Sequence, residues 1–184
     1  MGAEVFMLLA IAAPFITSAL VGMSDGKPNQ RETVTLVGAC ITFGVVLNLL
    51  PGAMSGVHTC ISLLEFLPGL SLRLELEPLG MMFALIASFL WIVSSIYSIG
   101  YMRGKKEGHQ TRFFMCFAIA IGSAMIVALA GNMVTLFIGY EVLSLSTYPL
   151  VAHHQDDKAR KGGRIYLGYL LSTSIGLLLL GMIW

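Results

Sequence analysis

One glutamate has the position and surroundings for ion chemistry. Glu141 lies inside the apolar run 132–151, which has about 20 residues, the length that crosses a hydrocarbon core of roughly 30 Å. With a rise of about 1.5 Å per residue, Glu141 lies roughly 15 Å from the start of the run, near the middle of a bilayer. A carboxylate at this depth is costly unless it is protonated, paired or hydrated. The position therefore predicts proton chemistry, and the alternative is a neutral acid that hydrogen-bonds a neighbouring helix.

Other polar side chains could support this glutamate. Ser144 and Tyr148 follow Glu141 at i+3 and i+7, so they share its helical face and could bond the carboxyl or hold water. Ordinary helix packing would produce the same stripe. His153 and His154 come at the end of the run and could deliver protons near neutral pH, although loop histidines are more often only solvated.

Arg164 begins the next apolar run. It either snorkels to lipid headgroups or biases the protonation of Glu141 through water or movement, since the two residues differ in depth. Asp156 and Asp157, beside the histidines, have poor chelating geometry. The three cysteines, at positions 40, 60 and 116, have no CxxC spacing, so we expect no metal site. No phosphate loop, nucleophile elbow or HExxH motif is present in the sequence, so we expect no cofactor and no catalytic chemistry in this chain.

Composition indicates a polytopic membrane protein. Hydrophobic residues make up 57% of the 184 and charged residues 11%, against about 25% charged in soluble domains. The net charge of +1, without a basic aromatic patch, predicts no nucleic-acid partner. Hydropathy predicts six spans that pass through the lipid bilayer. They are 4–23, 33–54, 78–100, 113–130, 132–151 and 165–184.

In the segment between the second and third spans, apolar and polar residues alternate with the two-residue period of a β-strand. Residues 70–77 alternate apolar and polar, residues 68–69 (Pro-Gly) signal a turn, and 59–66 could pair with them. We expect a β-hairpin at the membrane surface, the alternative being an irregular amphipathic loop. The predicted fold is an all-α polytopic membrane protein, with about six transmembrane helices and this short external hairpin. Residues 131–132 make so short a turn that the fourth and fifth helices must be antiparallel neighbours.

Basic residues predict the orientation. Segments 101–112 and 152–164 each hold four Lys or Arg, whereas 55–77 holds only Arg73. The positive-inside rule places the two basic segments in the cytoplasm and both termini outside, in the cell membrane of a prokaryote. The first span opens with Glu4 and lacks the basic leading region of a signal peptide, which remains the lesser alternative.

Four segments carry a resemblance to a known family. They are LEPLGMMFALIASFLWIVSSIYSIGYMRG, TRFF, YEVLSLSTYPLV and ARKGGRIYLGYLLSTS. The sequence resembles the proton-conducting membrane transporters, which include the antiporter-like subunits of complex I and of membrane-bound hydrogenases, and most closely resembles the D-like members of the Mrp type. Region 66–184, which would hold the hairpin end and helices three to six, carries the match, and 1–65 matches only in layout.

The resemblance implies roles for two residues. Glu141 stands at the family's fifth-helix glutamate, which takes part in proton translocation, and Arg164 stands where many members have a cation. Members usually contain two inverted helix repeats, and this chain reaches only into the first. We therefore expect an N-terminal part, or a short form that another chain completes.

The resemblance implies a membrane subunit of a monovalent cation/proton antiporter. Its partners would be other membrane subunits, the lipid bilayer, protons, and Na+ or K+ as candidate ions. One alternative is an energy-coupling subunit of a complex I-like NADH:quinone oxidoreductase, hydrogenase or CO2-handling complex. The other is a structural or assembly subunit that conducts nothing.

Overall fold

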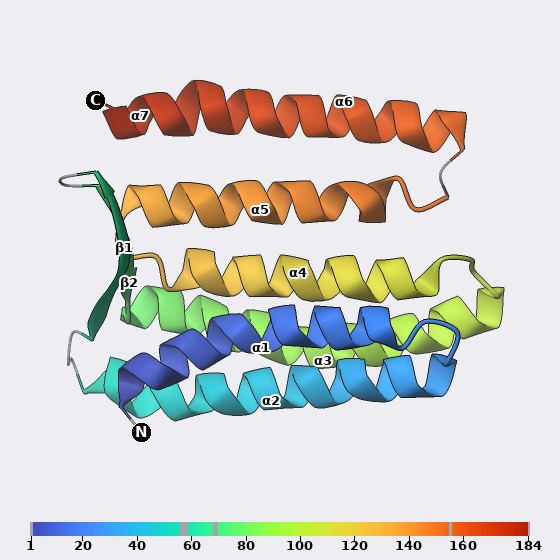
Figure 1. Ribbon diagram of the computed structural model, residues 1–184, viewed down its shortest axis with the longest axis horizontal. Helices are drawn as coiled ribbons and strands as arrows, with labels where there is room; N and C mark the ends of the chain where they lie inside the picture. The colour runs from blue at the N-terminus through green and yellow to red at the C-terminus, as the bar shows by residue number, and fades with distance from the viewer. Residues whose placement is uncertain (1, 56–58, 68–69, 155, 184) are drawn as a thin grey trace.

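The fold is a bundle of four helices extended on one side by two more. The computed structural model describes residues 2–55, 59–67, 70–154 and 156–183. Helices α1 to α4 pack around one another, and α5 and α6 continue beside α4 as a row (Figure 1). The elements are α1 (Ala3–Met23), α2 (Pro28–Met54), β1 (Cys60–Leu67), β2 (Leu70–Glu75), α3 (Pro78–Lys105), α4 (Gln110–Ala128), α5 (Met133–Val151), α6 (Asp157–Thr173), the π-helix η1 (Ser174–Leu179) and α7 (Leu180–Ile183).

Five of these helices, α1 to α5, are long and apolar enough to cross a membrane. The sixth predicted span is helical as well, because α6, η1 and α7 follow one another without a break. The π-helix divides this path, so that α6 by itself has only 17 residues. A π-helical turn inside an α-helix often marks a functional position. The prediction of an all-α membrane fold with a small hairpin is confirmed.

Four helices extend further into polar sequence than the predicted spans, and α2, α3 and α6 do so by five residues or more. Helix α2 begins at Pro28, so the start predicted at residue 33 was wrong, because proline suits the first turn of a helix. Helix α3 continues to Lys105, and α6 begins at Asp157, seven residues before Arg164. The side chain of Asp156 caps α6 by accepting a hydrogen bond of 2.6 Å from the N–H of Ala159. Hydropathy detects the apolar length of such a helix and misses its polar ends.

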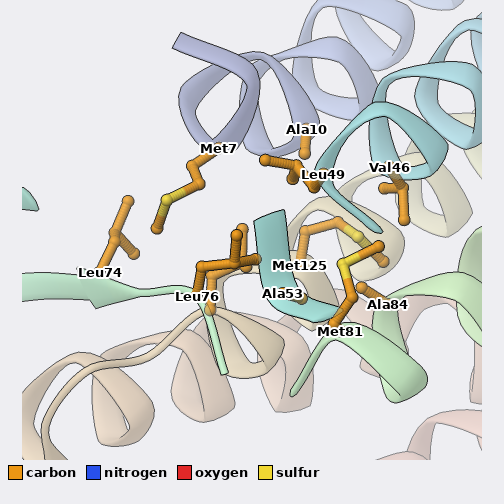
Figure 2. Close-up of a cluster of buried hydrophobic side chains, with 11 residues drawn as sticks. Met7, Ala10, Val46, Leu49, Ala53, Leu74, Leu76, Met81, Ala84 and Met125 are labelled. Atoms are coloured by element: carbon orange, nitrogen blue, oxygen red, sulfur yellow. The ribbon is translucent and has the colours of Figure 1, made fainter. Parts of the chain in front are cut away.

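The predicted hairpin is present and closes one end of the bundle. Strands β1 and β2 pair antiparallel, with Cys60 opposite Glu75, while the expected turn at residues 68–69 lies outside the described residues. Leu74 and Leu76 alternate onto the inner face and are 1% and 2% exposed. They join a cluster of side chains from α1, α2, α3 and α4 (Figure 2). The hairpin is therefore the packed cap of the four-helix core.

Close backbone approach holds the later helices in place. A Cβ on Gly80 of α3 would overlap the carbonyl oxygen of Ala128 in α4. A Cβ on Gly139 of α5 would lie 2.9 Å from Ile126 Cγ2 in α4. The expectation that α4 and α5 are antiparallel neighbours is confirmed (Figure 1).

The two ends of the molecule differ in charge. Both termini and the hairpin lie at one end, and the turns after α1, α3 and α5 lie at the other (Figure 1). Of the eleven Lys and Arg residues, all but Arg73 belong to the turns and helix ends opposite the hairpin. This asymmetry is what the positive-inside rule uses. That the basic end faces the cytoplasm stays a prediction.

Candidate functional site on the fifth helix

The N-terminus of α5 is fixed by one asparagine. Asn132 Oδ1 accepts hydrogen bonds from the N–H of Thr135 at 2.8 Å and from its hydroxyl at 2.7 Å. This N-cap satisfies one of the first-turn N–H groups that a helix leaves unpaired. Asn132 Nδ2 also donates to the carbonyl of Ser71 in β2 at 2.6 Å. One side chain thus caps α5 and ties it to the hairpin.

The backbone of β2 completes this anchor. Arg73 N–H donates to Thr135 Oγ1 at 2.9 Å, and its carbonyl accepts from Gly131 N–H at 2.8 Å. Glu75 N–H donates to the carbonyl of Leu129 at 2.8 Å. Since Thr135 is 1% exposed, the bond to its hydroxyl is shielded from water. The hairpin therefore fixes the axial position of α5 and, with it, the depth of every side chain on that helix.

Glu141 lies nine residues after the cap, about 14 Å along the helix. Its side chain is partly buried, and its Oε1 atom is buried and accepts no hydrogen bond from any residue in the described ranges. No Lys, Arg or His of the described chain forms an ion pair with it. A carboxyl oxygen in this position is costly when ionised, because a low-dielectric surrounding penalises unpaired charge. The arrangement suits a carboxyl group that exchanges a proton.

The two residues expected to support Glu141 contact other parts of the structure. Ser144 is 4% exposed, and its carbonyl accepts a hydrogen bond from Thr147 Oγ1 at 2.8 Å. The Tyr148 ring packs against α6, where a Cβ on Gly163 would lie 3.0 Å from Tyr148 Cε2. Within the described chain, neither hydroxyl is hydrogen-bonded to the carboxyl. Their place on the Glu141 face is as expected, and their role stays a prediction.

Arg164 follows Gly163 directly, so it lies near the level of Tyr148. Its side chain is exposed, and it forms no ion pair with a described residue. Tyr148 is seven residues from Glu141, about 10 Å along α5. The two residues thus lie at different depths, as expected. An influence of Arg164 on Glu141 stays a prediction.

A cleft of about 370 Å³ lies between α5 and the π-helix. It is lined by Tyr140, the neighbour of Glu141, and by two hydroxyl residues, Thr173 and Ser174, together with two leucines of η1. Buried water occurs where polar groups and sufficient room coincide. The cleft has room and two hydroxyl oxygens, whose protons go to carbonyls of their own helix, and Glu141 is not among its lining residues.

His153 and His154 lie at the basic end, beyond the last turn of α5. His153 is partly buried, its carbonyl accepts from Arg112 Nη2 at 2.7 Å, and its Nδ1 has no partner in the described ranges. Burial lowers the pKa of His153, and the charges of Arg112 and His154 lower it further. Glu107 and a hydrogen bond to the Gly108 backbone oppose this change. His154 is exposed, with Nδ1 3.8 Å from Glu107 Oε2.

Neither histidine lies beside Glu141, since about 15 Å of helix separates the glutamate from the end of α5. The described residues contain no group of three His, Cys, Asp or Glu side chains that could hold a metal ion. Within those residues the three cysteines are free thiols.

Comparisons with known proteins find similarity in sequence and in fold. Residues 69–114 match the family described as NADH-ubiquinone oxidoreductase (complex I), chain 5 N-terminus. The Na(+)/H(+) antiporter subunit A1 of Staphylococcus aureus, in strains JH9 and Newman, is 30% identical over 122 residues. That match covers 65% of this chain and 15% of the relative.

A solved structure shares the fold over nearly the whole chain. It is the membrane-bound sulfane sulfur reductase (MBS), an archaeal respiratory membrane complex, with a TM-score of 0.76 and 19% identity. The match covers 93% of this chain and 26% of that one. Together these findings support the proton-conducting antiporter-like family that the sequence predicts. The named relatives are subunits of the A type, and the closer resemblance to D-like members stays a prediction.

The five apolar helices and these relatives support a multi-pass membrane protein, and the chain spans 15% of the length of the curated relatives it matches. Sequence reasoning did not find the anchor made by Asn132, Thr135 and β2. One signal was available, because Asn-x-x-Thr directly before an apolar run is a typical N-cap pattern. The bonds to Ser71 and Arg73 had no sequence signal, since those partners lie about sixty residues away.

Proposed function

We propose that this chain is part of a membrane subunit that moves protons through Glu141 within an Mrp-like or complex I-like complex. The observation that carries the proposal is the buried, unpartnered Oε1 atom of Glu141 in the middle of a rigidly anchored helix. A neutral acid serving as packing glue would donate to or accept from a neighbouring helix, and the described residues offer no such bond. The names of the A1 relatives support cation/proton antiport as the overall activity.

The cleft beside Tyr140 supports a route for water toward this glutamate. A proton carrier must reach water from either side in turn, and half-channels near the midplane serve that purpose in transporters. In this proposal Arg164, two turns into α6, biases the proton affinity of Glu141 electrostatically from the basic end. His153 and His154 stand at the same end and would exchange protons with bulk water. Other membrane subunits would complete the path.

A second function has support of its own. The match to complex I chain 5 and the fold shared with a respiratory complex favour an energy-coupling subunit, in which Glu141 carries protons without cation exchange. A purely structural subunit is the third possibility. Cation dependence of proton movement separates the first two, and Glu141 variants separate both from the third.

The test uses Glu141→Gln, Glu141→Asp and Glu141→Ala in the complex that contains the chain, with proton flux and complex abundance measured together. Gln keeps size and hydrogen bonding but cannot ionise, so it should abolish flux at normal abundance. Asp keeps the charge and should retain partial flux. Ala should abolish flux with some loss of packing. Glu77→Gln, at the exposed N-cap of α3, is the matched control and should leave flux unchanged. Wild-type flux in Glu141→Gln would contradict the proposal.

A further inference from the structure

A second polar feature lies at the basic end, away from Glu141. The turn between α1 and α2 and the N-terminus of α4 enclose a cleft of about 650 Å³. Two arginines line it, Arg31 from α2 and Arg112 from α4. They are eighty-one positions apart in the sequence, so only the packing of α1, α2 and α4 brings them to one cleft.

The charge of Arg31 is buried and weakly compensated. Its side chain is 7% exposed, and it donates only to neutral acceptors, Thr111 Oγ1 at 3.2 Å and Gln110 Oε1 at 2.6 Å. Its guanidinium lies over the Phe114 ring, 5.5 Å from the centroid, and forms a long ion pair of 3.7 Å with the carboxylate of Glu32. Arg103 occupies that carboxylate with two short bonds of 2.8 and 2.6 Å. The Nε of Arg31 has no partner in the described chain. A further anion would stabilise a buried guanidinium that has a long ion pair and one unpartnered donor.

Arg112 is in a similar state. Its only hydrogen bond to the described residues is from Nη2 to the carbonyl of His153 at 2.7 Å, and its Nε is buried without a partner. The N-terminus of α4 adds further donors, because its N-cap, His109, makes no side-chain cap bond to the first-turn N–H groups. Free N–H groups and the helix dipole favour an anion at this position.

Two acidic residues also line the cleft, and each lies near a polar group outside the two arginines. Asp25 Oδ1 accepts from Thr111 Oγ1 at 2.8 Å. Glu107 Oε2 lies 3.8 Å from Nδ1 of His154. Neither carboxylate forms an ion pair with the cleft arginines among the described residues. Asp25 and Glu32 attract the charge of Arg31 but accept no hydrogen bond from it, and the Nε donors of Arg31 and Arg112 have no partner in the described chain.

We propose that this cleft binds a phosphate group, carried by a lipid headgroup or by a soluble phosphate. Phosphate oxygens accept several charge-assisted hydrogen bonds at once, which arginine guanidinium groups and helix N-termini both supply. The cleft lies where helices leave the apolar region, the level of lipid headgroups. The site is separate from Glu141 and does not depend on proton transport.

The test uses the purified full chain, stripped of lipid in neutral detergent. Native mass spectrometry measures binding of phosphatidylglycerol, and diacylglycerol with the same acyl chains is the control that lacks phosphate. A parallel arm measures the thermal stability of the chain with inorganic phosphate alone. Two variants probe the site. The first, Arg112→Gln, removes one cation from the cleft. Its matched control is Lys105→Gln, which removes an exposed cation outside the cleft.

The second variant adds a charge without removing a contact. Gly26 lines the cleft with φ +79°, and a Cβ there meets nothing within 4 Å. Both Asp and Asn tolerate this backbone region, so Gly26→Asp and Gly26→Asn differ only in charge. Gly26→Asp should bind phosphate about ten-fold more weakly than Gly26→Asn, and Arg112→Gln should lose about as much. Lys105→Gln should stay close to wild type.

Two outcomes support the proposal and identify the source. Binding of phosphatidylglycerol but not diacylglycerol, weakened by Gly26→Asp, assigns the site to a lipid headgroup. Stabilisation by inorganic phosphate alone, with the same sensitivity, assigns it to a soluble phosphate. The proposal is overturned if neither ligand binds, or if Gly26→Asp and Gly26→Asn bind equally.

Discussion

Replacing Asn132 by alanine should destabilise the chain through the anchor of α5. Loss of an N-cap costs about 1 kcal/mol, and loss of the bond to the Ser71 carbonyl costs about 1 kcal/mol more. The hydroxyl of Thr135 also loses its acceptor in a site that is 1% exposed. We therefore expect a loss of about 2 to 3 kcal/mol in the free energy of unfolding.

The matched variant is Asn132→Asp, which keeps the accepting oxygen of the cap but has no amide to donate to Ser71. It should lose about 1 kcal/mol, roughly half of the alanine effect. Reversible unfolding in mixed detergent micelles gives both values, and amide exchange at the first turn of α5 reports where the change occurs. An alanine effect below about 0.5 kcal/mol would refute the anchor, because ordinary surface substitutions fall within that range. Equal losses for Asp and Ala would refute the contribution of the cap, and an Asp variant as stable as wild type would refute the bond to β2.

Three other perturbations test the packing, the pH response and the topology. Gly80→Ala should lose about 1 to 3 kcal/mol in detergent unfolding, because its Cβ meets the α4 backbone, whereas Gly100→Ala in the same helix meets open space and should lose nothing. Because burial lowers the pKa of His153, the folded state binds fewer protons than the unfolded state just below about pH 6.5. Stability should therefore fall as pH drops through that window, and His153→Asn should flatten the profile; an unchanged profile would contradict this. In a background without the native cysteines, an impermeant thiol reagent should label Ser71→Cys but not Gly108→Cys in intact cells, and the reverse pattern would invert the topology.

Much of the fold could be predicted from sequence, because the hydropathy of a segment depends only on its own residues. Each apolar run therefore predicts a membrane span by itself, and the alternation in 70–77 predicts a strand with one buried face. Helix ends were less accurate, as at Pro28 and Asp157, because polar residues continue a helix without changing its hydropathy signal. The proline and the capping aspartate were the available signals there.

The candidate site also has features that the sequence predicts and features that it does not. The sequence by itself determined that Glu141 lies in the middle of a span, because depth follows from counting residues along one helix. Only the tertiary structure decided that its Oε1 has no partner in the described chain, that β2 holds the N-terminus of α5, and that Arg31 and Arg112 share a cleft. Hydrogen bonds and ion pairs act over a few ångströms, and the groups concerned lie sixty to eighty residues apart in sequence. Their proximity is set by the packing of helices and the hairpin, and no local pattern encodes it.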